Sequence, residues 1–270
     1  MSEEQKDQVE RVEQSPVEDA ERRMRQISRR SFLWAGVASL GAFTGWKWLD
    51  SRRLEDGQPW PFRRVLEVNR DLSEDYFRPG RLSPQFPLSA ASSVKVNGDY
   101  GVTANFNIAE WKLQVLGLAS QSQTGDAEPL LLTMKDIKKL PHHEMTTELK
   151  CIEGWSKIIH WGGARFSDFA AMVKPAEGGD GGPMPYVSLE TPDGGYYVGL
   201  DMASAMHPQT LLCYEMNGRP LTVEHGAPLR LVIPVKYGIK NIKRIGTIRF
   251  TDKRPADYWA EQGYDWYSGH

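Results

Sequence analysis

Apolar and polar residues alternate over several short stretches in the second half of the chain. Residues 111–115 alternate strictly and are followed by Gly117, a pattern typical of a half-buried strand. Residues 186–190 and 196–200 flank the sequence Pro-Asp-Gly-Gly, which predicts a β-hairpin. Further strand-like stretches are residues 148–152, 229–235 and 245–250.

Short helices are predicted between these strands. Each begins at a Thr, Ser or Asp that can cap its first turn, and each ends before a proline. The three helices cover residues 133–140, 168–173 and 201–207. Short strands mixed with short helices, without regular alternation of strand and helix, predict an α+β fold. We expect a single mixed, strand-rich domain over residues 94–270.

The amino-terminal segment has a different pattern. Residues 1–30 are rich in Glu, Gln, Arg, Asp and Ser and poor in apolar residues, so we expect a disordered charged leader. Arg29 and Arg30 precede an apolar stretch over residues 34–46, an arrangement similar to a twin-arginine export signal. An ordinary amphipathic or buried helix is the alternative, although the stretch has no polar face.

The signal segment, residues 28–49, is expected either to be cleaved after export or to remain as a membrane anchor. Residues 32–49 have only a marginal length for a spanning helix, which needs roughly 20 residues, and no Ala-x-Ala cleavage site follows them. Both outcomes place the domain outside the cytoplasmic membrane, in the periplasm or another extracytoplasmic space. Residues 50–93 are rich in Pro, Arg and Ser and predict an extended arm or linker.

Composition and charge exclude some classes of function. The chain has 33 Lys and Arg against 35 Asp and Glu, and its main body contains no basic block, which argues against a nucleic-acid partner. It also lacks a glycine-rich nucleotide-binding motif. The two cysteines, Cys151 and Cys213, lie in different contexts, so a disulfide framework is not expected. Cys213, in Leu-Leu-Cys-Tyr, has the pattern of a buried core thiol.

Cys151 lies where a predicted strand gives way to a turn rich in Gly and Trp, in Leu-Lys-Cys-Ile-Glu-Gly-Trp-Ser. A thiolate at such a place can face a cleft, and it is a soft ligand suited to a high-valent transition metal. The alternative is a small core residue, which is the usual role of a lone cysteine. The sequence His142-His143-Glu144 could indicate zinc, but adjacent histidines point in different directions and no partner motif follows.

A basic cluster lies nearer the carboxyl terminus, interleaved with Gly and Pro. It consists of His225, Arg230, Lys236, Lys240 and Lys243. Arginine offers a fork of donors, lysine a point charge and loop N–H groups further donors, so the cluster suits a bound anion. A solvated basic loop is the alternative, although the flanking residues are apolar and core-forming.

Five motifs follow one another in a fixed order: Cys-Ile-Glu-Gly-Trp-Ser, Ala-Met-His-Pro, Asn-Gly-x-Pro-Leu, His-Gly-Ala-Pro-Leu-Arg and Tyr-Gly-x-Lys-x-x-Lys. Over about residues 94–260, they resemble the molybdopterin-binding domain of the sulfite-oxidase superfamily. Within this superfamily, the chain most resembles the catalytic subunits of periplasmic methionine-sulfoxide reductases. The resemblance implies the sulfite-oxidase fold and a molybdenum–molybdopterin cofactor, with one pterin per chain.

The resemblance also implies roles for individual residues. Cys151 would be the catalytic residue and the molybdenum ligand. His225 and Arg230 would hold the pterin and its phosphate. A turn would close over that phosphate, and two further residues would contact the cofactor. The turn is Asn241, Ile242 and Lys243, and the two further contacts are Asn105 and Thr191.

The residues after Cys151 differ from the Gly-Asn-Arg-Arg of sulfite oxidases. Here Ile-Glu-Gly-Trp follows, and Glu153 would repel the sulfite dianion. We therefore expect two-electron oxygen-atom transfer with a small neutral oxo donor or acceptor, such as a sulfoxide. A membrane b-type cytochrome or a soluble cytochrome is the expected electron partner, because no second redox motif is present. The alternative is a non-catalytic, membrane-tethered binding domain that keeps the fold.

Overall fold

The computed structural model describes residues 16–55, 57–77, 80–93, 96–98, 100–102, 106–121 and 128–270. Asn105 lies outside these residues, so its role as a cofactor contact stays a prediction. The chain divides into two compact units, Met1–Arg53 and Leu54–His270. The second unit therefore begins well before residue 94, where the sequence predicts the start of the domain.

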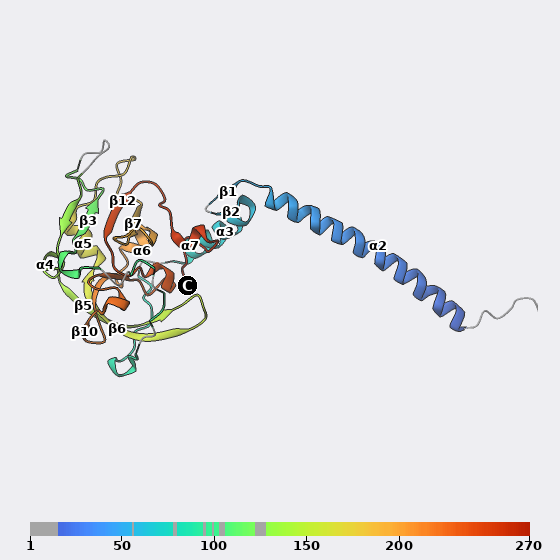
Figure 1. The fold of residues 1–270 in the computed structure, drawn as a ribbon, viewed down its shortest axis with the longest axis horizontal. Helices are drawn as coiled ribbons and strands as arrows, with labels where there is room; N and C mark the ends of the chain where they lie inside the picture. Colours follow the sequence, from blue (N-terminus) through green and yellow to red (C-terminus); the bar gives the residue numbers. More distant parts are fainter. Residues whose placement is uncertain are drawn as a thin grey trace, which may run out of the picture. The chain divides into compact units, whose positions relative to one another are not determined.

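The first unit contains one long helix, α2 (Pro16–Asp50) (Figure 1). The sequence predicts disorder over residues 1–30, whereas the structure is helical from Pro16, where good helix formers such as Glu, Arg, Ala and Met are frequent. No helix in the described part of the chain is both long enough and apolar enough for a membrane span. The large apolar side chains of α2 are exposed: Phe32, Leu33, Trp34, Val37, Leu40, Phe43, Trp46 and Trp48.

The segment predicted as an extended arm contains regular structure. Its elements are the paired strands β1 (Leu54–Glu55) and β2 (Gln58–Pro59) and the helix α3 (Trp60–Tyr76). Pro61 is compatible with α3 because proline is tolerated in the first helical turn. Arg63 is buried, and its Nη2 donates a hydrogen bond to the carbonyl oxygen of Ala260 at 2.6 Å. This segment therefore packs against the carboxyl-terminal residues as part of the domain.

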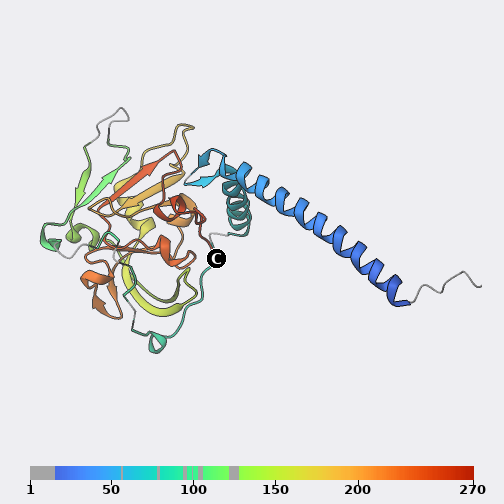
Figure 2. The same cartoon turned by 45° about the vertical axis from the view of Figure 1, so that its right-hand side comes forward.

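The first of two larger sheets is antiparallel, with the strand order β10-β9-β6-β5 and with β11 also paired to β9. β5 and β6 form a long hairpin that curves along one side of the domain (Figure 2, yellow-green). The strands are β5 (His142–Lys150), β6 (Ser156–Arg165), β9 (Leu211–Met216), β10 (Arg219–Pro220) and β11 (Arg230–Val232).

The second sheet has the order β4-β3-β12-β7-β8, in which β12 is parallel to β3 and the other pairs are antiparallel. The predicted hairpin is confirmed as β7 and β8, with Glu190 opposite Tyr197 next to the turn. The strands are β3 (Leu113–Leu116), β4 (Leu130–Leu132), β7 (Tyr186–Glu190), β8 (Tyr197–Asp201) and β12 (Thr247–Thr251).

Short helices connect the strands. They are α4 (Met134–Ile137), α5 (Phe166–Val173), α6 (Met202–Ala205) and α7 (Tyr258–Glu261), with 3-10 turns η1 (Leu88–Ala90), η2 (Ile108–Glu110), η3 (Val223–His225) and η4 (Gly238–Lys240). One large apolar cluster joins α5, through Phe166 and Phe169, to strands of both sheets. One antiparallel and one mixed sheet, joined by short helices, confirm the predicted α+β fold.

Candidate active site

Cys151 occupies the tight turn that joins β5 to β6. Its backbone N–H donates to the carbonyl oxygen of Trp155 at 2.9 Å, and its own carbonyl accepts from the N–H of Gly154 at 3.1 Å. Gly154 has a φ of +86°, a conformation that a residue with a side chain rarely adopts. The turn therefore fixes the backbone of Cys151 at the end of the hairpin, while its side chain stays partly exposed.

Two loops from the basic cluster approach this turn. A Cβ atom on Gly238, at the start of η4, would lie 3.3 Å from the carbonyl oxygen of Lys150, next to Cys151. A Cβ atom on Gly226, which has a φ of +97°, would lie 2.8 Å from the Cβ of Lys243. Glycine at both places allows the η4 loop to pack closely against the hairpin and the η3 loop to pack against the segment after η4.

Arg230 joins the two loops from within the core. Its Nη1 donates to the carbonyl oxygen of His225 at 3.1 Å, and its Nη2 donates to that of Asn241 at 3.1 Å. Its guanidinium also lies over the ring of Trp161, with the carbon 5.0 Å from the centroid. Arg230 therefore positions the loops through their backbones, in addition to contributing a positive charge.

These elements enclose a cavity of about 510 Å³. The cavity brings together Cys151 and four of the predicted cofactor residues, which come from separate parts of the chain. The four are His225, Arg230, Asn241 and Lys243. The sulfur of Cys151 is thus not sealed in the core, and it shares one cavity with the basic groups, as the sequence predicts.

The cavity carries positive charge on one wall. Arg230 is buried, and among the described residues no carboxylate lies within ion-pair distance of it. Burial lowers the pKa of Arg230 to about 10, so its guanidinium stays charged at neutral pH. Burial, together with the charges of Arg230 and Lys243, lowers the pKa of His225 below its ordinary value, which leaves the imidazole neutral. This wall suits an anionic group that accepts hydrogen bonds.

The environment of Cys151 disfavours a free thiolate. Burial raises the pKa of its thiol; the backbone N–H of Glu153 acts in the opposite direction, and the carboxylate of the same residue raises the pKa further. Without a metal, the sulfur is therefore protonated at neutral pH. A soft metal ion would replace that proton, because thiolates bind such ions strongly.

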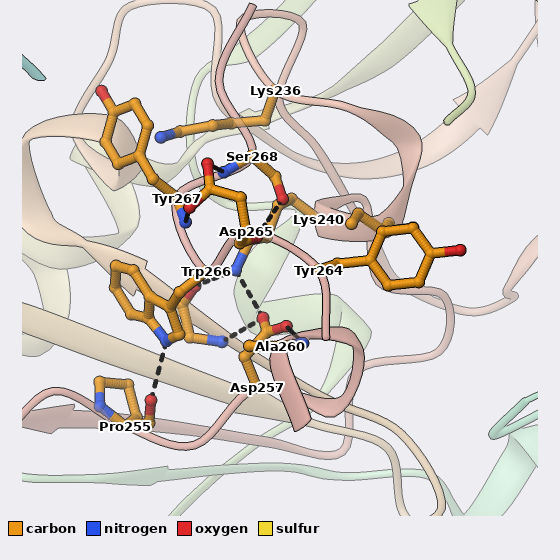
Figure 3. A network of polar contacts seen from close by, with 12 residues as sticks. Lys236, Lys240, Pro255, Asp257, Ala260, Tyr264, Asp265, Trp266, Tyr267 and Ser268 are labelled. Carbon is orange, nitrogen blue, oxygen red and sulfur yellow. Dashed lines mark hydrogen bonds and ion pairs between the residues drawn. The ribbon is translucent and has the colours of Figure 1, made fainter. Parts of the chain in front are cut away.

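Two lysines of the basic cluster lie away from the cavity, in the network of Figure 3. Lys240 is fully buried, and its Nζ donates to Asp257 Oδ2 at 2.5 Å and to the carbonyl oxygen of Gly199 at 2.9 Å. Lys236 is also buried, over the ring of Tyr267. The expectation that all five basic residues form one anion site is therefore corrected, since these two hold the carboxyl-terminal segment in place.

Other predicted cofactor residues have structural contacts. Thr191 is buried and does not line the cavity; its hydroxyl donates to Asp193 and accepts from the N–H of Tyr196 in the hairpin turn. Ile242 is buried in the large apolar cluster. Asn241 accepts from the N–H of Ile233 at 2.8 Å. The roles of these residues as cofactor contacts stay predictions.

Several cavity residues are missed by the sequence analysis. Asn97 donates from Nδ2 to the Cys151 sulfur at 3.8 Å, and Lys243 holds its segment by donating to the carbonyl oxygen of Asn97 at 2.7 Å. Aromatic rings form much of the remaining wall. They are Tyr100, Trp155, Tyr196, Trp259 and Tyr264. Of these, Trp155 is part of the Cys151 motif that the sequence analysis identifies. The concentration of Tyr and Trp near the carboxyl terminus is the only local signal for Trp259 and Tyr264, and Tyr100 and Tyr196 have none.

Comparison with known proteins agrees with this arrangement. Residues 100–259 match the family described as the oxidoreductase molybdopterin binding domain. YedZ1 of Azospira oryzae, which is provisionally named a protein-methionine-sulfoxide reductase subunit, is 31% identical over 247 residues, covering 90% of this chain and 88% of YedZ1.

Two proteins named protein-methionine-sulfoxide reductase catalytic subunit MsrP are also similar. The one from Ralstonia nicotianae is 36% identical, covering 58% of this chain and 50% of MsrP, and the one from Campylobacter jejuni is 35% identical, covering 61% and 58%. The chain thus spans about half the length of these MsrP relatives. Among solved structures, sulfane dehydrogenase SoxCD from Paracoccus pantotrophus matches with 20% identity and a TM-score of 0.47, over 56% of this chain and 40% of that one.

Proposed function

Because this chain belongs to the family of oxidoreductases with a molybdopterin binding domain, we propose that it is a sulfoxide reductase of the MsrP type. The proposed substrate is methionine sulfoxide within proteins, after the names of the relatives. The observation that carries the proposal is the cavity in which the Cys151 sulfur meets the basic wall of His225 and Arg230. The family to which the chain belongs and the residues that line the cavity both support oxygen-atom transfer at a molybdenum centre.

The residues of the cavity fit a molybdenum–molybdopterin cofactor, with one pterin per chain. Cys151 offers the soft sulfur ligand that the metal needs. Arg230, buried without a carboxylate partner among the described residues, offers the charge that a pterin phosphate needs, and the neutral His225 offers a hydrogen bond. When bound, the molybdenum centre supplies the two-electron exchange that removes the oxygen of a sulfoxide.

The chain's own residues select the substrate. Glu153 lines the cavity, and its carboxylate accepts a hydrogen bond from Trp155 Nε1 at 2.8 Å, which fixes a negative charge near Cys151. This charge repels the sulfite dianion but not a neutral sulfoxide. The rings of Trp259 and Tyr264 on the same cavity suit the methyl and sulfur of a methionine side chain, because sulfur packs favourably against aromatic rings.

The reaction requires electrons from another protein. Reduction of R2S=O to R2S consumes two electrons and two protons and releases water, and the sequence has no motif for a second redox centre. We propose a b-type cytochrome of the membrane or a soluble cytochrome as the donor. Arg29 and Arg30, ahead of an apolar stretch, support export of the folded protein to the periplasm.

The test uses full-length protein produced in a host that makes the molybdenum cofactor. Molybdenum and pterin are measured per chain, together with dye-linked reduction of a peptide containing methionine sulfoxide and dye-linked oxidation of sulfite. We expect about one molybdenum per chain, turnover of the sulfoxide and little turnover of sulfite. Cys151→Ser should abolish turnover, whereas Cys213→Ser, at a fully buried cysteine outside the cavity, should retain it.

Each outcome has a defined meaning. A stable, folded chain without molybdenum would favour a non-catalytic binding domain and overturn the proposal. Full occupancy by molybdenum with turnover of sulfite but not of sulfoxide would agree with a molybdenum enzyme of this family, but would overturn the proposal that the substrate is a sulfoxide. Sulfoxide turnover that survives in Cys151→Ser would overturn the role of the sulfur.

A further inference from the structure

A second group of chemically active side chains lies on the first large sheet, outside the cavity of Cys151. It consists of His142 and Glu144 of β5 and Glu215 of β9. One ligand atom from each, an imidazole nitrogen and two carboxylate oxygens, lies within 4.8 Å of the others. Distances of this size match the separation of atoms that bind one metal ion after small side-chain rotations.

The strand register explains why these residues meet. His142 and Glu144 are two residues apart on one strand, so their side chains share a face of the sheet. Glu144 lies opposite Gly162 of β6, and Gly162 lies opposite Glu215 of β9. Three adjacent strands therefore converge at this place. The sequence showed no partner for the histidines because Glu215 is distant along the chain.

Gly162 leaves room for the ligand atoms. A Cβ atom at this position would lie 2.9 Å from Glu215 Oε2 and 3.1 Å from His142 Nε2. The pairing of β6 with β9 also shifts register directly after it, between Gly162 and Gly163. The ligand atoms thus lie over a glycine in the middle strand, where any larger residue would displace them.

His160 supports the group from the side. Its Nδ1 shares a hydrogen bond with the hydroxyl of Thr146 at 2.9 Å, which orients the ring. Its Nε2 lies 3.7 Å from Glu144 Oε1, within ion-pair distance of that carboxylate. Partners of this kind orient the ligands of many metal sites.

We propose that His142, Glu144 and Glu215 bind one divalent transition-metal ion, with Zn²⁺ as the best match. Imidazole nitrogen and carboxylate oxygen are both zinc ligands, and water completes the coordination because His142 and Glu144 are exposed and Glu215 is partly exposed. In the structure His142 Nε2 lies 3.1 Å from Glu215 Oε2, and a bound ion would replace this contact by taking both atoms as ligands. The bound ion joins β5 to β9 across β6 and so braces the sheet whose hairpin presents Cys151.

The test is calorimetric titration of tag-free, full-length protein with Zn²⁺, followed by Co²⁺ as a spectroscopic probe. We expect one ion per chain at this site, and a Kd raised at least tenfold by His142→Ala and by Glu215→Gln. His160→Ala should weaken binding less, because this residue orients Glu144 rather than binding the ion.

The control is His143→Ala. His143 is the sequence neighbour of His142, but its Nε2 lies 3.3 Å from Asp168 Oδ2, in a separate contact. Unchanged affinity in His143→Ala with loss in His142→Ala supports the site. No binding by the wild-type chain, or equal affinity in all variants, overturns it. A Co²⁺ absorption band that persists in both ligand variants would also overturn it.

Discussion

The buried ion pair between Lys240 and Asp257 offers a direct test of how the fold supports the cavity (Figure 3). Both side chains are almost fully buried. Asp257 also accepts from the N–H of Ala260 at 3.0 Å, which caps α7, and from the N–H of Gly199 at 3.2 Å. Asp257→Ala removes all of these contacts and leaves the ammonium of Lys240 buried with one carbonyl partner, that of Gly199.

The expected loss of stability is large. Removing one partner of a buried ion pair costs about 3–5 kcal/mol, and loss of a helix cap adds about 1 kcal/mol. We therefore expect Asp257→Ala to lower the free energy of unfolding by roughly 4–6 kcal/mol, close to the whole stability of many domains. Because Lys240 ends η4, cofactor retention should fall as well.

The measurement is urea denaturation followed by tryptophan fluorescence. Asp252→Ala is the matched control, because Asp252 is exposed and its loss should change stability by less than about 0.5 kcal/mol. The double variant Lys240→Met, Asp257→Ala should be more stable than Asp257→Ala alone, since it no longer buries an uncompensated charge. A loss below about 1 kcal/mol in Asp257→Ala, or a double variant less stable than the single one, would refute the reasoning.

Three further outcomes are expected. Burial lowers the pKa of Lys236 to about 7, whereas the pKa of a lysine in an unfolded chain is near 10.4. Between about pH 7 and pH 10 the unfolded chain therefore binds more protons than the folded chain, so the free energy of unfolding rises with pH in this range. Urea denaturation at pH 6, 8 and 10 should show that the free energy of unfolding depends less on pH in Lys236→Met than in the wild-type chain. An equal dependence on pH in both chains would contradict this. Glu153→Gln should lower the pKa of the Cys151 thiol and speed its alkylation by iodoacetamide at pH 8 in cofactor-free protein, and an unchanged rate would count against the charge effect. Gly226→Ala should lower the free energy of unfolding by about 1–3 kcal/mol and reduce the amount of bound pterin, because the φ of Gly226 is +97° and a methyl group there would contact Lys243. An unchanged pterin content would contradict the idea that the contact between Gly226 and Lys243 shapes the cofactor site.

Elements that depend on neighbouring residues are predicted well from the sequence. Thr133 begins α4 as expected, and a capping box with Asp136 forms there, because both partners lie within one turn. The hairpin around residues 192–195 forms because its turn residues favour it locally. The position of Cys151 at the end of a strand is also predicted from neighbouring residues, and the structure agrees, since β5 ends at Lys150.

Elements that depend on distant contacts are not predicted. The Pro, Arg and Ser content of residues 50–93 predicts an extended arm, whereas the structure forms helix α3 within this segment. Arg63 gives the reason for the difference, since its contact with Ala260 joins residues 197 positions apart. The same holds for Asn97 and for the aromatic residues of the cavity other than Trp155, which reach Cys151 only through the fold.

The basic cluster shows why composition alone could not identify the anion site. Its charges are similar in the sequence, but acidic residues elsewhere in the chain separate their roles. Asp257 pairs with Lys240 in the core and makes that lysine part of the fold. Arg230 is equally buried, yet no carboxylate among the described residues pairs with it, so its charge acts on the cavity that contains Cys151. The position of the acids therefore determines which bases can bind an anion, and this position is a property of the fold.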